Sequence, residues 1–229
     1  MAELEIRPPR QERTQLAWER ILDAGASLLE ETGYDGFTIA AICRRAQVSP
    51  PAIYARVNGK RSLFLAVFEH GFAPVRRGQQ QALDPAQWQD CSPEDLVRGA
   101  IGAVVRTSLP HAGFLRPVIW RAERDAEVAA GTREARAGIA ARFRTLMLRM
   151  PEASRHPDPD RIDMCFRVVF AAVMARIAFP TVLDTGRQLS GDEFVAELQE
   201  LGVGLILRPG GEQARHAHRA RGRGAGSRN

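Results

Sequence analysis

The sequence contains few cysteines and a single lysine. Its three cysteines, Cys43, Cys91 and Cys165, are odd in number and too widely spaced for a zinc knuckle or a redox pair. We therefore expect reduced thiols, no metal site and no cofactor. Lys60 is the only lysine among 32 basic residues, so arginine supplies almost all of the positive charge.

Long uninterrupted apolar runs are also missing. The most apolar stretch, residues 162–183, contains Arg167, Arg176 and Pro180, which excludes it as a membrane span. The first 15 residues mix acids and bases and lack the apolar core of a signal peptide. These observations predict a cytoplasmic protein.

The motifs of common enzyme classes are absent as well. The chain has no H-E-x-x-H, G-x-S-x-G or P-loop pattern, and the carboxylates of HPDPD at residues 156–160 lack metal-ligand spacing. We therefore expect no catalytic residues and a protein that is not an enzyme. A helical interaction protein and a small-molecule-binding protein without specific DNA binding are the alternatives to a DNA-binding protein.

The positive charge is concentrated at the carboxy terminus. The net charge is +5, and residues 208–229 contain six arginines and one glutamate, while residues 1–207 hold 26 basic and 26 acidic residues. The stretch 209–229 is rich in glycine and arginine, with alanine as its main apolar residue, and we expect it to be disordered. The net charge of the chain therefore does not by itself indicate a nucleic-acid-binding surface within residues 1–207.

The apolar residues follow helical spacing throughout. Residues 14–32 repeat them at intervals of three, four and seven, and Gly33 stands where a helix would end. Sustained β-type alternation is missing, and so is a repeat of 20 to 50 residues. The sequence predicts an all-α fold, in which a polar stretch from Arg76 to Pro93 separates the first helices from later ones near 94–109, 114–125, 128–150, 160–183 and 192–207.

A basic, acid-free segment lies between two turn signals. Residues 43–64 carry five basic side chains and no carboxylate. Thr38 can cap one short helix, and Ser49 can cap another three residues after the first ends. Two short helices joined in this way are the geometry of a helix-turn-helix, and an acid-free surface suits contact with DNA phosphates. A solvated basic face is the alternative, but the cap and turn signals coincide with the charge.

This segment resembles the DNA-binding segment of the TetR family of bacterial transcriptional regulators. Residues 38–64 read TIAAICRRAQVSPPAIYARVNGKRSLF, and the matching positions are Thr38, Ile42, Ala46, Val48, Ser49, Tyr54, Lys60 and Leu63. Gln47 replaces the turn glycine of the family, and at positive φ it would cost on the order of 1 kcal/mol. Val57 replaces a phenylalanine. Pro50 and Pro51 fall in the first helical turn, where N–H groups have no intrahelical partner.

The resemblance implies a DNA-binding role for one set of residues. It suggests groove or rim contacts for Pro50, Pro51, Ala52 and Arg56, of which the first three can offer only apolar contact. Tyr54 would meet a phosphate, although packing on Ile39 in the core is an alternative. Lys60 would bind a phosphate at a helix N-terminus. The expected DNA-binding residues are Thr38, Arg44, Arg45, Ser49, Pro50, Pro51, Ala52, Tyr54, Arg56 and Lys60.

The resemblance also implies the organisation of the whole chain. It suggests a three-helix DNA-binding domain at 14–74 with its helix-turn-helix at about 37–57, an effector-binding and dimerisation domain at 75–208, and the tail at 209–229. Such a protein would be a ligand-responsive repressor that binds a near-palindromic operator as a homodimer through helices 160–183 and 192–207. A single monomeric core formed by both helices is the alternative.

A small-molecule effector is the remaining expected partner. An apolar pocket could be lined by Phe114, Trp120, Phe143, Met147, Phe166, Phe170 and Met174, although simple core packing is an alternative for each. Arg116, Arg121 and Arg124 could bind an anionic group or could merely be solvated.

Overall fold

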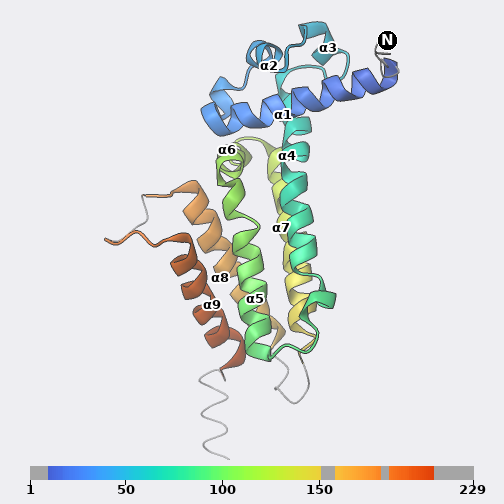
Figure 1. Ribbon diagram of the computed structural model, residues 1–229. Helices are drawn as coiled ribbons and strands as arrows, with labels where there is room; N and C mark the ends of the chain where they lie inside the picture. Colours follow the sequence, from blue (N-terminus) through green and yellow to red (C-terminus); the bar gives the residue numbers. More distant parts are fainter. Residues whose placement is uncertain (1–9, 151–157, 182–185, 209–229) are drawn as a thin grey trace, which may run out of the picture.

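The helices of the protein form a small group at one end and a longer bundle below it (Figure 1). The computed structural model describes residues 10–150, 158–181 and 186–208, and every regular element within these ranges is helical, as the sequence predicts. The elements are α1 (Arg10–Gly36), α2 (Ile39–Ala46), α3 (Pro50–Tyr54), α4 (Lys60–Ala82), η1 (Pro85–Trp88), α5 (Pro93–Arg106), η2 (Leu109–His111), α6 (Ala112–Ala122), α7 (Ala126–Met147), α8 (Pro159–Ala178) and α9 (Gly191–Leu207).

The first group packs around one aromatic cluster. Helix α1 lies across the end of the molecule, with α2 and α3 on its outer side and the start of α4 beside it (Figure 1). Phe37 and Phe64 are fully buried and meet edge to face, and the Tyr34 ring lies next to both. Gly33 has a φ of 65°, which permits the bend that brings Tyr34 and Phe37 onto this core.

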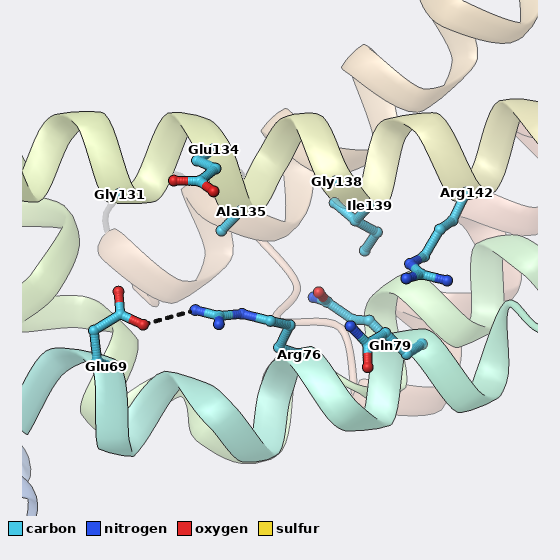
Figure 2. Close-up of a pocket in the computed structure, with 10 residues that line it drawn as sticks. Glu69, Arg76, Gln79, Gly131, Glu134, Ala135, Gly138, Ile139 and Arg142 are labelled. Atoms are coloured by element: carbon cyan, nitrogen blue, oxygen red, sulfur yellow. Dashed lines mark hydrogen bonds and ion pairs between the residues drawn. The ribbon is translucent and has the colours of Figure 1, made fainter.

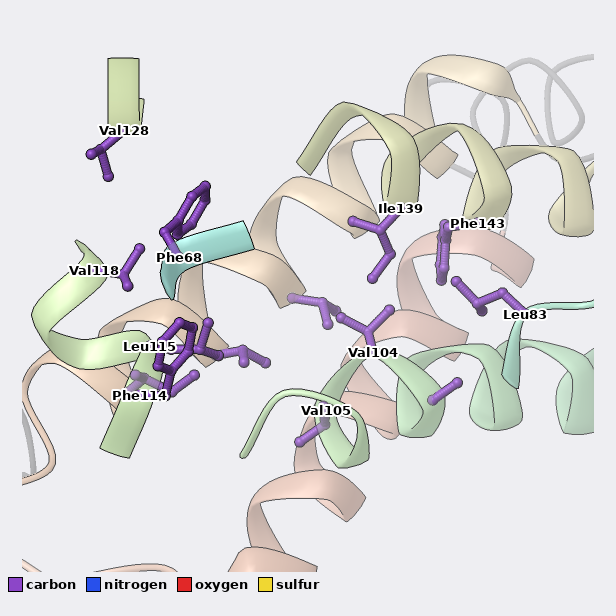
Figure 3. Packing of buried hydrophobic residues seen from close by; sticks show 14 of the residues in the cluster. Phe68, Leu83, Val104, Val105, Phe114, Leu115, Val118, Val128, Ile139 and Phe143 are labelled. Atoms are coloured by element: carbon purple, nitrogen blue, oxygen red, sulfur yellow. The ribbon is translucent and has the colours of Figure 1, made fainter. Parts of the chain in front are cut away.

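The larger group buries a continuous apolar core between α4 and α9. Figure 3 shows side chains from four of these helices meeting in it, among them Phe68 of α4, Val104 of α5, Leu115 of α6 and Phe143 of α7. Helix α5 packs mainly against α9, and α8 lies against both α7 and α9. The Ser190 side chain and Glu193 form a reciprocal capping box that fixes the start of α9.

Helix α4 extends further than the sequence suggested. The stretch from Arg76 was expected to be a polar connection, but α4 continues to Ala82, because Val75, Gln79 and Leu83 lie four residues apart and are all buried. At about 1.5 Å per residue, its 23 residues span roughly 34 Å. The expected boundary between residues 74 and 75 therefore falls inside a helix that belongs to both groups. The expected disordered tail, 209–229, lies outside the described residues.

Cys43, Cys91 and Cys165 are free thiols, and burial raises the pKa of Cys165 to about 12. Within the described ranges, no three His, Cys, Asp or Glu side chains lie close enough to hold a metal ion. None of the helices described is both long and apolar enough to cross a membrane.

Gly202 sets the close approach of α9 to α5, so Gly202→Ala should destabilise the fold. An added Cβ would overlap the terminal methyl of Ile101, which is fully buried and cannot move aside, and would lie 3.3 Å from the sulfur of Cys165. We expect the free energy of unfolding in urea to fall by about 1 to 3 kcal/mol. Gly138→Ala on α7 is the matched control, since its Cβ would meet no atom within 4 Å. It should stabilise the protein by up to about 1 kcal/mol, and equal losses in both variants would contradict this account.

Candidate functional site

Local backbone preferences fix the turn between α2 and α3. The backbone N–H of Ala41 donates to the Thr38 hydroxyl at 3.1 Å, so Thr38 caps α2 as predicted. Gln47 ends α2 in the left-handed conformation, with φ 54° and ψ 48°, and the N–H of Val48 donates to the carbonyl of Cys43 at 3.1 Å. A non-glycine residue therefore does occupy positive φ at this turn, with the strain that this implies.

Ser49 begins α3 differently from the prediction. It stands at the N-cap with φ −83° and ψ 152°, but its side chain makes no capping hydrogen bond. The reason is that Pro50 and Pro51 carry no N–H to donate, and the first available N–H, that of Ala52, donates instead to the Ser49 carbonyl at 3.0 Å. The Ser49 hydroxyl thus remains on the exposed surface.

The two helices present one buried and one exposed face. Ile42, Cys43, Ala46 and Ile53 are buried and attach the unit to the first core. The predicted contact residues lie on the other face, and Tyr54 is 56% exposed, so it is not the core tyrosine of the alternative interpretation. The exposed members of the predicted set are Thr38, Arg44, Arg45, Ser49, Pro50, Pro51, Tyr54 and Arg56, while Ala52 and Lys60 are half-buried.

The basic residues of this face differ in the contacts that they make with the rest of the protein. Arg44 makes no ion pair or hydrogen bond with any described residue. Arg45 forms a two-point ion pair with Glu31 of α1, at 2.6 and 2.7 Å, which lowers the pKa of that carboxyl. Arg56 lies over the Trp18 ring at 5.5 Å. The segment is acid-free in sequence, but the fold brings Glu31 to Arg45 and Asp125 and Glu127 to Arg61, and spacing within the segment could not reveal these pairs.

Lys60 is held at the junction of α1 and α4. Its ammonium group donates to the backbone carbonyl of Tyr34 at 3.1 Å and lies 4.3 Å from the centre of the Tyr34 ring. The guanidinium of Arg121 on α6 lies 4.2 Å from the centre of the same ring. Tyr34 therefore links the start of α4 to α6.

Asp125 ties the amino-terminal end of α4 to the larger group. Arg61 donates to both of its carboxylate oxygens, at 3.0 and 3.1 Å, and Arg121 donates at 3.0 Å. The carboxylate also accepts from the backbone N–H groups of Glu127 and Val128, where it caps α7. The Arg61 guanidinium holds the pKa of Asp125 well below its usual range, with Arg121 and the backbone donors adding to the effect.

An apolar cavity lies in the larger group, between α4, α6, α7 and α8. It encloses about 230 Å³ and is lined by apolar side chains that include Phe72, Val75, Leu115, Ile139 and Met174. Gln79 of α4 contributes a side chain that is only 7% exposed, and Arg133 and Arg136 stand at its exposed edge. Gln79 is not among the pocket residues predicted from the sequence. A glutamine midway between Val75 and Leu83 on the buried stripe of α4 was the signal that could have revealed it.

The residues predicted to line an effector pocket separate into groups. Phe170 and Met174 line this cavity, and with Phe166 they also line an open groove of about 750 Å³ between α7 and α8. Phe143 and Met147 are fully buried in the core, and Phe114 packs against Gly71. Trp120 is 49% exposed and stacks near Phe179. Helical spacing predicts which face is buried but not where packing leaves space.

The three arginines considered for an anionic ligand have other surroundings. Arg116 donates to the carbonyl of Ile177 at 2.9 Å and thereby links α6 to α8. Arg121 is committed to Asp125 and Tyr34. Arg124 is exposed and lines none of the cavities described.

Asp125→Asn should destabilise the protein by about 1 to 3 kcal/mol, because it removes charge-assisted hydrogen bonds while Arg61 can return to water. The Asp125 side chain is 3% exposed and that of Arg61 is 56% exposed, which favours this moderate value. Because the folded state lowers the pKa of Asp125, its contribution is complete above the ordinary carboxyl pKa of about 3.9 and disappears only as the pH falls below it.

Urea unfolding at several pH values would check this. The difference between the variant and the parent protein should be equal at pH 7 and pH 5 and shrink below about pH 4. Glu127→Gln is the control, because Glu127 also pairs with Arg61 but is largely exposed, and it should have a much smaller effect. A difference that already shrinks between pH 7 and pH 5 would contradict the assignment.

A segment near the amino terminus and the fold both match known regulators. Residues 21–67 match the model of the family described as bacterial regulatory proteins, tetR family. The A-factor receptor protein of Streptomyces griseus is 31% identical over 71 residues, which are 31% of this chain and 26% of the receptor, so the chain spans about a quarter of that relative.

Solved structures agree over almost their whole length. A TetR-like transcriptional regulator from Rhodococcus sp. RHA1 has a TM-score of 0.61 at 19% identity, with 86% of this chain and 97% of that one covered. A bacterial regulatory protein of the tetR family, also from Rhodococcus RHA1, has a TM-score of 0.65 at 18% identity, covering 85% and 98%. Salmonella enterica GusR has a TM-score of 0.59 at 19% identity, covering 88% and 98%. At these identities the likeness shows the fold, and the match over residues 21–67 shows that this segment is similar to the tetR family of bacterial regulatory proteins.

Proposed function

We propose that the protein is a repressor that binds a near-palindromic operator as a homodimer and is released by a small molecule in the cytoplasm. The exposed face of α2 and α3 carries the proposal, because it combines Arg44, which has no ion pair among the described residues, with a turn fixed by Thr38 and Gln47. Arginine can read guanine or bind phosphate, and a short helix opening after such a turn can enter the major groove. The proposed protein is not an enzyme and uses no cofactor.

The contacts of each side chain suggest its role on DNA. Arg44 and Arg56 are the strongest candidates for base contacts, since neither is held by an ion pair within the described residues. Pro50, Pro51 and Ala52 can offer only apolar contact, for example to a thymine methyl. The exposed Tyr54 hydroxyl and the hydroxyls of Thr38 and Ser49 suit phosphates. Arg45 and Lys60 would exchange their contacts with Glu31 and Tyr34 for phosphates.

Arg44→Ala and Lys60→Ala should affect DNA binding in different ways. If Arg44 reads a guanine, its removal should weaken operator binding by about 1 to 3 kcal/mol and relax preference at one base pair. Removal of Lys60 should weaken binding to all sequences and reduce the salt slope by about one unit, because one phosphate contact is lost. Fluorescence anisotropy with DNA from the region upstream of the gene, at several salt concentrations, measures both.

Arg142→Ala is the control for these measurements, because Arg142 is an exposed arginine on α7, in the larger helical group. It should leave operator affinity and the salt slope unchanged. An unaltered slope in Lys60→Ala would remove Lys60 from the interface and leave it only the structural contact with Tyr34. A uniform loss across sequences in Arg44→Ala would make Arg44 a phosphate contact.

The exposed faces of α8 and α9 support the proposed dimer. Met164 and Val168 on α8 and Leu201 on α9 are large apolar side chains left exposed in the single chain. A second copy of the same pair of helices would cover them and form a four-helix interface. Two recognition helices could then reach successive major grooves, about 34 to 36 Å apart.

Val168→Glu and Leu201→Glu should therefore convert the dimer into a monomer, because each places a charge in the proposed apolar interface. Light scattering coupled to size exclusion, at micromolar protein concentration, would measure the mass. Leu148→Glu is the control, since Leu148 is an equally exposed leucine at the end of α7. Monomeric parent protein, or dimeric variants at both positions, would refute this interface.

Helix α4 supplies a physical route between ligand and DNA. Its first residues, Lys60 and Arg61, lie against the DNA-binding group, and Phe72, Val75 and Gln79 line the cavity. A ligand that binds unequally to two positions of α4 would change the separation of the recognition helices in the dimer. The relative from Streptomyces griseus is itself named a receptor, which supports a ligand response. Release of bound operator by a ligand, measured by anisotropy, tests this step.

A further inference from the structure

We infer that the cavity between α4, α6, α7 and α8 takes an uncharged, largely apolar ligand whose single carbonyl or hydroxyl group is recognised by the side-chain amide of Gln79. This inference rests on the proposed ligand response and adds the chemical class of the ligand. It is carried by the burial of Gln79, by its lack of hydrogen-bond partners and by the distribution of charge around the cavity.

Gln79 is a polar side chain where packing alone would favour an apolar one. It lies on the buried stripe of α4, four residues from Val75 and four from Leu83, both of which are 1% exposed. Its side chain is 7% exposed and makes no hydrogen bond with the described residues, although an amide has two donors and an acceptor. Among the described residues, Arg121 Nε is the one fully buried side-chain polar atom without a partner, so the Gln79 amide still has access to the cavity space. A ligand carbonyl or hydroxyl in the cavity would supply the partner that the protein does not.

The other polar groups of the cavity wall are either already bonded or exposed. The Ser108 hydroxyl donates to the carbonyl of Val104 at 2.8 Å, and that of Thr132 donates to the carbonyl of Ala129 at 3.0 Å. Glu123, Arg133 and Arg136 are exposed and carry charges of both signs at the edge. A carboxylate or an ammonium group deep in the cavity would therefore find no buried counter-charge among the described residues and would lose its hydration.

A second cavity meets the first at Gln79. It encloses about 270 Å³ between α4 and α7, and Figure 2 shows the Glu69–Arg76 ion pair along it, with Glu134 and Arg142 nearby. Gln79, Ala135 and Ile139 line both cavities. Gln79 thus stands at the boundary between a polar space and an apolar one, where the apolar body of a ligand would end and its polar group would begin.

Three probes with matched chains test the class of ligand. Octan-2-one, octanoate and octylamine share the apolar chain but end in a neutral carbonyl, an anion and a cation at pH 7. Isothermal titration of the full-length protein should show that the ketone binds at least tenfold more tightly than either ion. Equal or tighter binding of octanoate or octylamine, or no binding of the ketone, would overturn the inference.

Gln79→Leu tests the amide itself, and Gln80→Leu is the matched control on the neighbouring, exposed glutamine, which does not line the apolar cavity. Gln79→Leu should fold, because it places an apolar side chain on the buried stripe of α4, and should bind octan-2-one roughly tenfold more weakly. Gln80→Leu should bind it like the parent protein. Gln79→Met, which is closer in shape, replaces Gln79→Leu if the leucine variant does not fold. Unchanged ketone affinity in the folded Gln79 variant would show that the amide has only a structural role.

The same titrations distinguish this inference from the proposed function. If the ketone binds through Gln79 but leaves operator affinity unchanged, the ligand class stands and the proposed coupling to DNA fails. If octanoate binds more tightly and releases operator, the coupling stands and the ligand class fails.

Discussion

The carboxylate of Asp125 joins the two helical groups at the start of α4, the helix that belongs to both of them. It holds Arg61 at the amino-terminal end of α4 and Arg121 of α6, and it caps α7 through two backbone N–H groups. A nearly buried carboxylate needs all of these donors, since a charge removed from water is stable only when it is fully paired. The position of α4 relative to α6 and α7 is thereby tied to one side chain.

Tyr34 and Lys60 extend this junction to the surface proposed to bind DNA. The Tyr34 ring lies between the cations of Lys60 and Arg121, and its carbonyl accepts the hydrogen bond from Lys60. The residue expected to bind phosphate is thus also a residue that holds α4 against the bend of α1. If the proposed function is correct, a change in the position of α4 alters both the contacts of Lys60 with Tyr34 and the orientation of α2 and α3. The ligand response and DNA contact would then share the same few interactions.

The fold was predictable to a large extent because local signals agree with one another. Helical spacing, Thr38 as a cap and the short turn at Gln47 are properties of neighbouring residues, and the structure has them where the sequence suggested. Ser49 shows the limit of this reasoning, because Pro51 removes the N–H at N2 and the N–H of Ala52 at N3 donates to the Ser49 carbonyl instead of its hydroxyl. The extent of α4 shows another limit. Most residues from Arg76 to Ala82 are polar, so the sequence suggested a connection. The helix continues because its few buried residues pack against neighbouring helices.

The sequence by itself determined the all-α class, the helix-turn-helix and the basic, acid-free segment, since each depends on residues close together in the chain. Only the tertiary structure decided that Glu31 pairs with Arg45, that Asp125 receives Arg61, and that Phe143 and Met147 fill the core while Gln79 faces a cavity. Ion pairs between distant segments and the space left by packing depend on how whole helices are placed. Periodicity along one helix identifies its buried face but carries no information about what lies opposite.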